Sequence, residues 1–248
     1  MREFVLRLNS AYLENERSIW ICEPERVSDA SELVVFLDGE RYRDRVGALS
    51  VIEELRGHMA DSWFVFVSEA SPEARWRECP CYPPFAAFVG EELLTWLGSG
   101  YIDVNRIQRR VLAGLSYTGL GAAFVAKEYP LSFQRIISQS GSFWWNDCWL
   151  AEEFRRLGRK IPVEFWLDVG TQEVRENVRH REDAVQVVSQ IEGVRRFRDA
   201  LLAQGYAVQY KEFNGDHDYA SWNRSLVDAL KWAVPLSNPE GVANCQDT

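Results

Sequence analysis

Residues 111–120 read VLAGLSYTGL, the pattern of a buried strand that ends in a tight turn and continues as a helix. In enzymes with a serine nucleophile on such a turn the motif is Gly-x-Ser-x-Gly, because small flanking residues let strand and helix pack closely around a strained serine. Gly114 and Ser116 fit this motif, but Thr118 occupies the place of the second glycine. Residues at a helix N-terminus have negative φ, which a threonine adopts readily. We therefore predict that Ser116 is a nucleophile and that Thr118 is a tolerated departure.

Apolar runs rich in β-branched and aromatic residues recur on both sides of this stretch and alternate with helical periodicity. Nearly continuous apolar strands are typical of a sheet that is buried on both faces. The alternation predicts an α/β fold with a mostly parallel central sheet of about eight strands and helices on both faces. After an opening hairpin formed by EFVLRL and SIWICEP, the expected strands are 33–38, 63–68, 110–115, 135–140, 163–170 and 208–213. The expected helices are about 45–58, 84–98, 119–129, 190–204 and 219–233.

No linker or internal repeat interrupts this pattern, so we expect one domain over residues 1–235 and a polar, frayed tail over 236–248. The chain has 37 acidic and 28 basic residues, which gives a net charge of −9. This surplus disfavours nucleic acid or an anionic membrane surface as the main partner. No targeting signal is evident, and no window approaches the ~18 apolar residues of a membrane span.

The five cysteines are odd in number and scattered, and Cys79 and Cys81 are too close for an ordinary disulfide or a zinc knuckle. We therefore expect a reduced, cytoplasmic protein. The three histidines, His58, His180 and His217, lie far apart, so a histidine-rich metal site is not expected. We expect no metal and no other cofactor, and the sequence leaves the oligomeric state open.

Three polar side chains follow the carboxyl ends of separate predicted strands, where ligands bind in open parallel sheets. In chain order they are Ser116, Glu173 in GTQE, and His217 in NGDHDY. A serine hydroxyl needs a neutral imidazole to accept its proton, and a carboxylate must hold that imidazole in the right tautomer. The order serine, acid, histidine predicts a catalytic triad. Nearby alternatives for the acid are Asp168, Glu176 and Asp183.

An acyl-transfer site also requires backbone donors that stabilise the oxyanion. One is the amide of Tyr117, directly after the serine. The other should come from the loop after LVVFLD, at Gly39 or Glu40, and we select Glu40. Arg41 and Tyr42 stand beside this loop and are candidate substrate contacts.

The segment VLAGLSYTGLGAAFVAKEYPLSFQRIISQSGSFWW resembles the core of the putative esterase (esterase D-like) branch of the α/β-hydrolases. LVVFLDGERY, SQSGSFWW and GDHDYASW are each similar to segments of the enterochelin (siderophore trilactone) esterases in that branch. A further motif of that subgroup resembles the segment ARWRECPCYPPFAAFVGEELLTWL through Arg75, Glu78, Phe85, Phe88, Glu92 and Leu93. The resemblance spans roughly residues 30–235, and its motifs together are more specific than a lone serine motif.

The resemblance implies an α/β-hydrolase fold and a cofactor-free serine esterase with Ser116 as nucleophile, His217 as base and Glu173 as acid. It implies a siderophore-like trilactone or another aryl-bearing ester as the small-molecule substrate. Two positions depart from the family, because Thr118 replaces a glycine and Asp216 replaces the glycine before the histidine. Neither change removes a reacting atom.

Trp144 and Trp145 follow SQSGSF, where they would either line the acyl or aryl pocket or pack beneath a lid. Arg175 belongs to a cluster of cations after the acid. Such a cluster would suit an anionic ferric siderophore if it lies on the rim of the site, and is otherwise a solvated face.

Other reactions on the same triad are alternatives within enzymes. They are hydrolysis of an S-formylglutathione-type thioester, hydrolysis of a feruloyl ester, and acyl transfer to an alcohol. Outside enzymes, the alternative is a non-catalytic binding module on the same fold. The retained serine, histidine and acid argue against that module.

Overall fold

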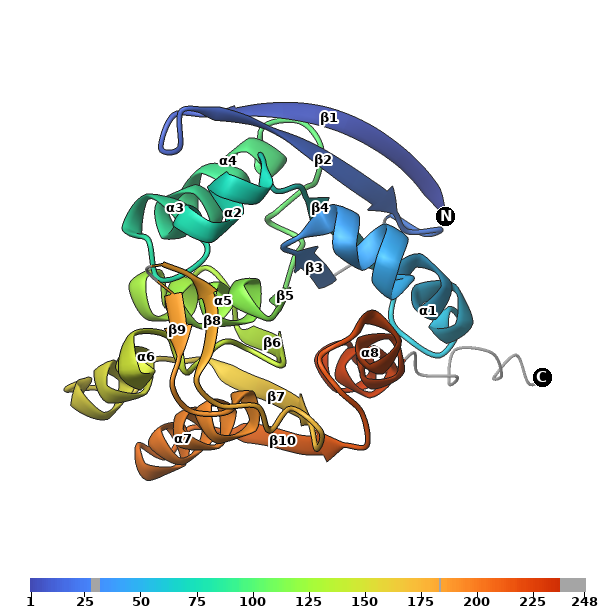
Figure 1. Cartoon of the computed structure of the whole chain (residues 1–248). Coiled ribbons are helices and arrows are strands. Elements are labelled where there is room, and N and C mark those ends of the chain that lie inside the picture. The colour runs from blue at the N-terminus through green and yellow to red at the C-terminus, as the bar shows by residue number, and fades with distance from the viewer. Residues whose placement is uncertain (28–31, 183, 237–248) are drawn as a thin grey trace, which may run out of the picture.

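The structure, a computed structural model, describes residues 1–27, 32–182 and 184–236. Its centre is a sheet of eight strands (Figure 1). From one edge to the other they are β1 (Arg2–Ser10), β2 (Asn15–Glu23), β4 (Ser62–Val67), β3 (Glu32–Phe36), β5 (Arg109–Leu115), β6 (Arg135–Gln139), β7 (Glu164–Gly170) and β10 (Val208–Phe213). The β1–β2 and β2–β4 pairs are antiparallel, and all other neighbours pair parallel. The predicted α/β class with a mostly parallel sheet is confirmed.

Helices cover both faces of the sheet, as predicted (Figure 1). One face packs against α1 (Ala48–Leu55) and α8 (Tyr219–Ala233). The other packs against α5 (Tyr117–Glu128), α6 (Trp145–Arg156) and α7 (Gln190–Ala203). The short helices α2 (Pro72–Glu78), α3 (Pro83–Ala87) and α4 (Leu93–Gly98) lie near the β1–β2 hairpin, which curves over them (Figure 1).

The apolar runs of the central strands divide between these two helical layers. In β3, Leu33 and Val35 pack on the side of α5, whereas Val34 and Phe36 pack on the side of α8. All four side chains have no solvent exposure. Each stabilises the fold by about 1.5–3 kcal/mol relative to an exposed position. Burial on both faces therefore explains why the strand shows no polar alternation.

Several elements differ from those that the sequence predicts. The predicted helix 45–58 is divided at Gly47, whose φ of 74° suits glycine, into a π-helical turn (Arg41–Val46) and α1. Helices α2 and α6 and a hairpin of β8 (Val178–Arg181) with β9 (Ala184–Gln186) were not predicted. Their sequences are short or rich in charged residues, so no apolar period marks them.

The chain beyond α8 returns toward the sheet. Leu236, the first residue of the predicted tail, forms an isolated β-bridge with Met59. The rest of that tail, 237–248, lies outside the described residues. Within the described part of the chain, none of the helices has the length and apolar character needed to span a membrane.

Asp168 is a wholly buried carboxyl group in β7. Its Oδ2 accepts a hydrogen bond from Trp166 Nε1 at 2.9 Å, and its Oδ1 has no hydrogen-bond partner among the described residues. Burial raises the pKa of Asp168 from 3.8 to about 7. Since the unfolded carboxyl ionises first, the folded state loses stability as the pH rises from about 4 to about 7.

We therefore expect Asp168→Asn to stabilise the protein relative to wild type more at pH 8 than at pH 5. The difference in unfolding free energy should grow by roughly 2–3 kcal/mol over that interval. Urea unfolding of both proteins at the two pH values measures it. An equal difference at both values would contradict the raised pKa.

Candidate active site

The carboxyl ends of three parallel strands bring together three polar side chains. Ser116 directly follows β5, Glu173 follows β7 by three residues, and His217 follows β10 by four. Because β5, β6, β7 and β10 are consecutive neighbours in the sheet, their following loops meet at one edge. The sheet topology therefore places the serine, acid and histidine in one region.

Ser116 has a strained backbone with φ of 53° and ψ of −119°. Its amide donates to the Gln139 carbonyl at 2.9 Å, and its own carbonyl accepts from the Ser142 amide at 2.9 Å. The turn also requires Gly114, because a Cβ at that position would lie 2.1 Å from the Thr118 carbonyl oxygen. Non-glycine residues with such positive φ cluster at functional sites, where the surrounding structure holds the strain.

Thr118 lies in the first turn of α5 with a helical backbone, as expected. Its buried hydroxyl accepts a hydrogen bond from the Leu115 amide at 3.0 Å. The single hydroxyl proton can go to the Leu115 carbonyl at 2.8 Å or to Asp38 Oδ2 at 3.0 Å. Asp38 also binds the guanidinium of Arg75, with Nη2 2.7 Å from Oδ2. The threonine thus ties the turn to β5 and to the loop after β3.

The side chain of His217 lies within hydrogen-bonding distance of both Ser116 and Glu173. His217 Nε2 is 3.0 Å from Ser116 Oγ, and His217 Nδ1 is 2.6 Å from Glu173 Oε2. Glu173 is buried, and the side chain of His217 is 36% exposed. In this arrangement Nδ1–H donates to the carboxylate and Nε2 accepts from the hydroxyl, which suits proton transfer from the serine.

The other acids near the site do not share this position. Asp168 Oδ2 accepts a hydrogen bond from Trp166 rather than from the imidazole of His217. Glu176 is exposed in the loop before β8. Asp183 lies outside the described residues. Among the described acids, Glu173 is the one whose carboxylate is hydrogen-bonded to the imidazole of His217, whereas Asp216 Oδ1 accepts from the His217 backbone amide at 2.8 Å.

A cavity of about 340 Å³ opens beside Ser116. Its lining combines aromatic, cationic and polar side chains, and two of the predicted substrate contacts, Trp144 and Arg175, belong to it. The full lining is Arg75, Trp76, Ser116, Tyr117, Ser142, Trp144, Glu173, Arg175, Val178, His180, Gln186, Gln190, Asp216 and His217. A volume of this size is typical of a small-molecule site.

Four other predicted site residues lie outside this lining. Tyr42 is fully buried, and its hydroxyl donates to Gln139 Oε1 at 2.9 Å, because the π-helical turn points its ring into the core. Arg41 donates to the Glu69 carboxylate at 3.1 Å and the Tyr219 hydroxyl at 3.1 Å. Trp145 packs edge-on against Trp149, with ring centroids 6.2 Å apart. The fourth, Glu40, accepts a hydrogen bond from the Glu69 amide at 3.2 Å.

The two predicted oxyanion donors, Tyr117 and Glu40, lie in different structural environments. Tyr117 is the first residue of α5, where backbone amides point out of the helix N-terminus toward the site. Glu40 immediately precedes the π-helical turn, and burial raises the pKa of its carboxyl group. Tyr117 also contributes its ring to the cavity wall, 4.6 Å from the ring of Trp76.

The β8–β9 hairpin, which Figure 1 shows beside α5 and α6, was not predicted from the sequence. It contributes Val178, His180 and Gln186 to the cavity lining. His180 of this hairpin stacks on Trp144, with ring centroids 5.1 Å apart and planes at 12°. The neighbouring Arg181 places its guanidinium 5.6 Å from the centroid of the Trp76 ring. Arg175, just before the hairpin, lies 3.7 Å from Asp216 as an ion pair. The predicted cation cluster therefore lies partly on the rim of the cavity.

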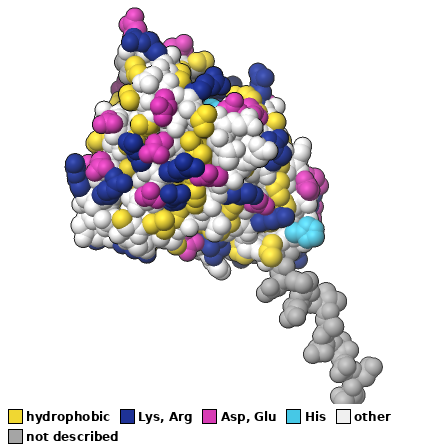
Figure 2. Space-filling model, turned by 60° about the horizontal axis from the view of Figure 1, so that its bottom comes forward, with side chains coloured by type: hydrophobic (Ala, Val, Ile, Leu, Met, Phe, Trp, Pro, Cys, Tyr) yellow, Lys and Arg dark blue, Asp and Glu magenta, His cyan; other side chains and the backbone are white. Residues whose placement is uncertain are grey.

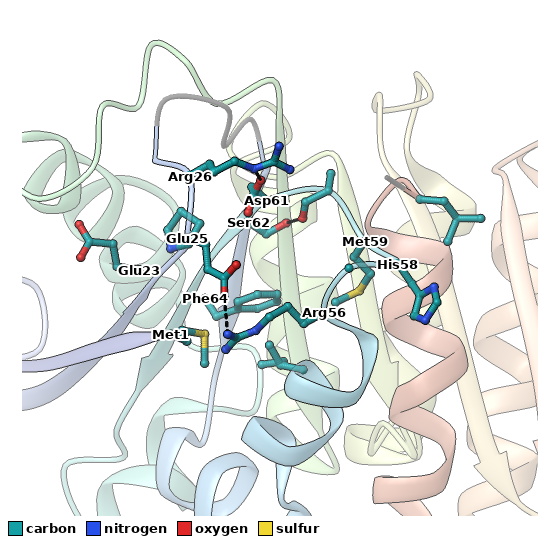
Figure 3. Close-up of a pocket in the computed structure, with 15 residues that line it drawn as sticks. Met1, Glu23, Glu25, Arg26, Arg56, His58, Met59, Asp61, Ser62 and Phe64 are labelled. Atoms are coloured by element: carbon teal, nitrogen blue, oxygen red, sulfur yellow. Dashed lines mark hydrogen bonds and ion pairs between the residues drawn. The ribbon is translucent and has the colours of Figure 1, made fainter. Parts of the chain in front are cut away.

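A larger cavity, of about 770 Å³, lies elsewhere, at the amino end of β4 (Figure 3). Its charges pair with one another: Arg26 contacts Asp61 at 2.8 Å, and Arg56 contacts Glu25 at 2.5 Å. Its serine, Ser62, donates to a backbone carbonyl two residues earlier, at 2.7 Å. These contacts occupy both arginines and the serine, so size alone does not make this cavity the reactive site.

Charges of both signs are interspersed on the surface. In Figure 2, Lys and Arg side chains alternate with Asp and Glu side chains across the face shown. Surface ion pairs include Arg195 with Glu212 at 2.8 Å and Arg135 with Glu164 at 2.8 Å. Such a mixed face lacks the single-sign field with which proteins attract polyanions.

Cys79 and Cys81 are both free thiols. Burial raises the pKa of both, so they are poor nucleophiles at neutral pH. Among the described residues, no group of three or more His, Cys, Asp or Glu side chains is arranged to hold a metal ion.

The hydrogen bonds of the Thr118 hydroxyl suggest a test of what stabilises the turn at Ser116. Thr118→Val keeps the shape but removes the hydroxyl, so it should destabilise the protein by about 1–3 kcal/mol. Thr118→Ser retains the hydroxyl and serves as the matched control, with a smaller expected loss. Urea unfolding of the three proteins measures the difference. Equal stability of the valine and serine variants would show that these hydrogen bonds do not stabilise the turn.

Comparison with known proteins identifies the family that this chain matches. The putative esterase family matches residues 10–233. The iron(III) enterobactin esterase of Dickeya dadantii is 27% identical over 250 residues, covering 96% of this chain and 56% of that protein. The iron(III) enterobactin esterase of Escherichia coli O6:H1 is 30% identical over 239 residues, covering 89% and 54%. The chain therefore spans just over half the length of these curated relatives.

Solved structures share the fold at lower identity. The enterobactin esterase of Shigella flexneri, solved in the presence of enterobactin, matches with a TM-score of 0.76 and 22% identity, over 93% of this chain and 58% of that chain. A siderophore hydrolase of Aspergillus nidulans matches with a TM-score of 0.68 and 18% identity, over 93% of both chains. With the match over residues 10–233, these comparisons establish that the chain belongs to the putative esterase family.

Proposed function

We propose that this protein hydrolyses carboxylic esters, with Ser116 as nucleophile, His217 as general base and Glu173 as the acid that orients it. The observation that carries the proposal is the pair of contacts made by His217. Its Nε2 lies 3.0 Å from the serine hydroxyl, and its Nδ1 lies 2.6 Å from the carboxylate. Both distances are within the reach required for proton transfer and orientation.

In the proposed reaction, Ser116 Oγ attacks the ester carbonyl carbon while its proton moves to His217 Nε2. The resulting imidazolium is stabilised by Glu173. Amides of Tyr117 and Glu40 are proposed to stabilise the negative oxygen of the tetrahedral intermediate. The imidazolium then protonates the departing alcohol, which leaves an acyl-serine. Water, deprotonated by His217, releases the acid and restores the serine, and no step needs a cofactor.

We infer that the substrate is an aryl-bearing, anionic ester of the siderophore type. The cavity supports this through its aromatic wall of Trp76, Tyr117 and Trp144 and its cation Arg175. Aromatic faces bind an aryl ring, and guanidinium groups bind anionic oxygens. Enterobactin esterases and a siderophore hydrolase are among the similar proteins.

We further propose that the protein works in the cytoplasm. Four cysteines in the described part of the chain are free thiols: Cys22, Cys79, Cys81 and Cys148. Unpaired cysteines are typical of proteins in a reducing compartment.

Replacing the proposed nucleophile tests the chemistry. Ser116→Ala and His217→Gln should each lower kcat for p-nitrophenyl butyrate and for an aryl trilactone by at least about 10³-fold. His58→Gln, which changes a histidine of the remote cavity in Figure 3, is the matched control and should behave as wild type. Activity retained in folded Ser116→Ala would refute the mechanism.

The inferred substrate charge has a separate test. Arg175 is largely exposed, so its attraction to an anionic substrate should be worth at most about 1 kcal/mol, or roughly fivefold in kcat/KM. Arg175→Gln should lower kcat/KM for an anionic aryl ester by that factor and leave a neutral ester of similar size unchanged. Arg179→Gln alters an exposed arginine outside the cavity lining and is the control. Equal losses on both esters would argue against the anionic substrate.

A further inference from the structure

The carboxylate of Glu173 has a second set of partners that the proposed steps do not use. Its Oε1 accepts one hydrogen bond from Ser140 Oγ at 2.6 Å and another from the Gly170 amide at 2.7 Å. Its Oε2 is left to face His217. A free glutamate side chain samples several rotamers, and ordering it costs entropy. The two bonds to Oε1 therefore hold a flexible side chain in one orientation.

Ser140 is itself rigidly held. It is fully buried, and its φ of 45° is left-handed, which is uncommon for serine. Its amide donates to the Asp168 carbonyl at 2.9 Å, and its carbonyl accepts from Gln190 Nε2 at 2.5 Å. The side chain of Gln190 also accepts from Trp144 Nε1 at 2.6 Å. The hydroxyl of Ser140 thus projects from a backbone that is fixed on several sides.

The direction of the Ser140 hydroxyl follows from its other neighbour. Trp222 Nε1 lies 3.0 Å from Ser140 Oγ, and an indole N–H can only donate. Ser140 Oγ must therefore accept from Trp222, which directs its single proton to Glu173. The ring of Trp222 also meets His217 edge-on, with centroids 4.8 Å apart and planes at 81°. One indole therefore contacts both the imidazole and the support of the acid.

We propose that Ser140 is a positioning residue for the triad and that Trp222 sets the direction of its hydroxyl. The chain of hydrogen bonds runs from Trp222 through Ser140 and Glu173 to His217. Ser140 is buried outside the cavity lining, so it would act through the carboxylate rather than on the substrate. The proposal rests on the proposed function, because it assigns Ser140 a role in orienting the same imidazole.

Ser140→Ala and Ser140→Gly test this role, and glycine also suits the left-handed backbone. Both should lower kcat by roughly 10- to 100-fold, the effect typical of losing a residue that orients an active-site group, while KM changes little. Ser138→Ala is the matched control. Ser138 lies in β6, two residues before Ser140, is equally buried, and has no hydrogen-bond partner for its hydroxyl among the described residues. It should retain the wild-type kcat.

Trp222→Phe keeps an aromatic ring but removes the donor that directs the hydroxyl. It should lower kcat in the wild-type background and have no further effect in Ser140→Ala, because the two residues act through one hydrogen bond. Additive losses would contradict that coupling. The proposal would be overturned if kcat in the two folded Ser140 variants stays within about twofold of wild type, or if Ser138→Ala loses as much.

A spectroscopic readout separates this proposal from the proposed function. The Nδ1 proton of His217, held by Glu173, should give a low-field proton resonance in wild type and in Ser138→Ala. The resonance should shift or broaden in Ser140→Ala. This measurement needs no substrate, so it tests the role of Ser140 even if the wild-type protein hydrolyses no ester. A lack of ester hydrolysis would count against the proposed function but not against the positioning role. An unmoved resonance in Ser140→Ala would overturn the positioning role.

Discussion

The strained backbone at Ser116 is the constraint on which the site depends. A backbone φ of 53° at a non-glycine residue costs roughly 1–3 kcal/mol of conformational free energy. This conformation persists because hydrogen bonds hold both the amide and the carbonyl of Ser116. The Gln139 carbonyl accepts its amide proton, and the Ser142 amide binds its carbonyl. Both partners belong to β6 or the turn after it, so the neighbouring parallel strand holds the serine in place. The hydroxyl is thereby presented to His217 at the carboxyl edge of the sheet.

Burial decreases outward from the sheet toward the cavity. Glu173 lies in the buried layer, with Gly170 and Ser140 as fixed donors to one of its oxygens. His217 comes from a loop after β10 and is partly exposed, which fits its proposed role in exchanging protons with substrate and water. The outermost layer is the β8–β9 hairpin, whose His180 rests on Trp144. The proposed catalytic residues thus follow strands of the sheet, whereas part of the cavity wall comes from a hairpin outside it.

Local sequence patterns predict much of the fold. The features that they do not predict depend on contacts between residues far apart in the sequence. Continuous apolar runs mark the central strands because both faces are buried, and Ser116, Glu173 and His217 are predicted because each follows such a strand. The structure brings these three within hydrogen-bonding distance, while their catalytic roles stay predictions. The hairpin has no apolar period to reveal it. Tyr42 stands beside the oxyanion loop in sequence, but the π-helical turn directs its ring into the core, which adjacency alone cannot show.

Covalent labelling of Ser116 tests the central claim most directly, because it needs no knowledge of the natural ester. Intact-mass and peptide analysis would follow reaction of wild type and His217→Gln with a fluorophosphonate. The proposed triad predicts a single adduct on Ser116 in wild type and much slower labelling in His217→Gln, since the hydroxyl then lacks its base. No adduct, or an adduct on another residue, would contradict the assignment of Ser116 as the nucleophile and leave a binding protein on an esterase scaffold.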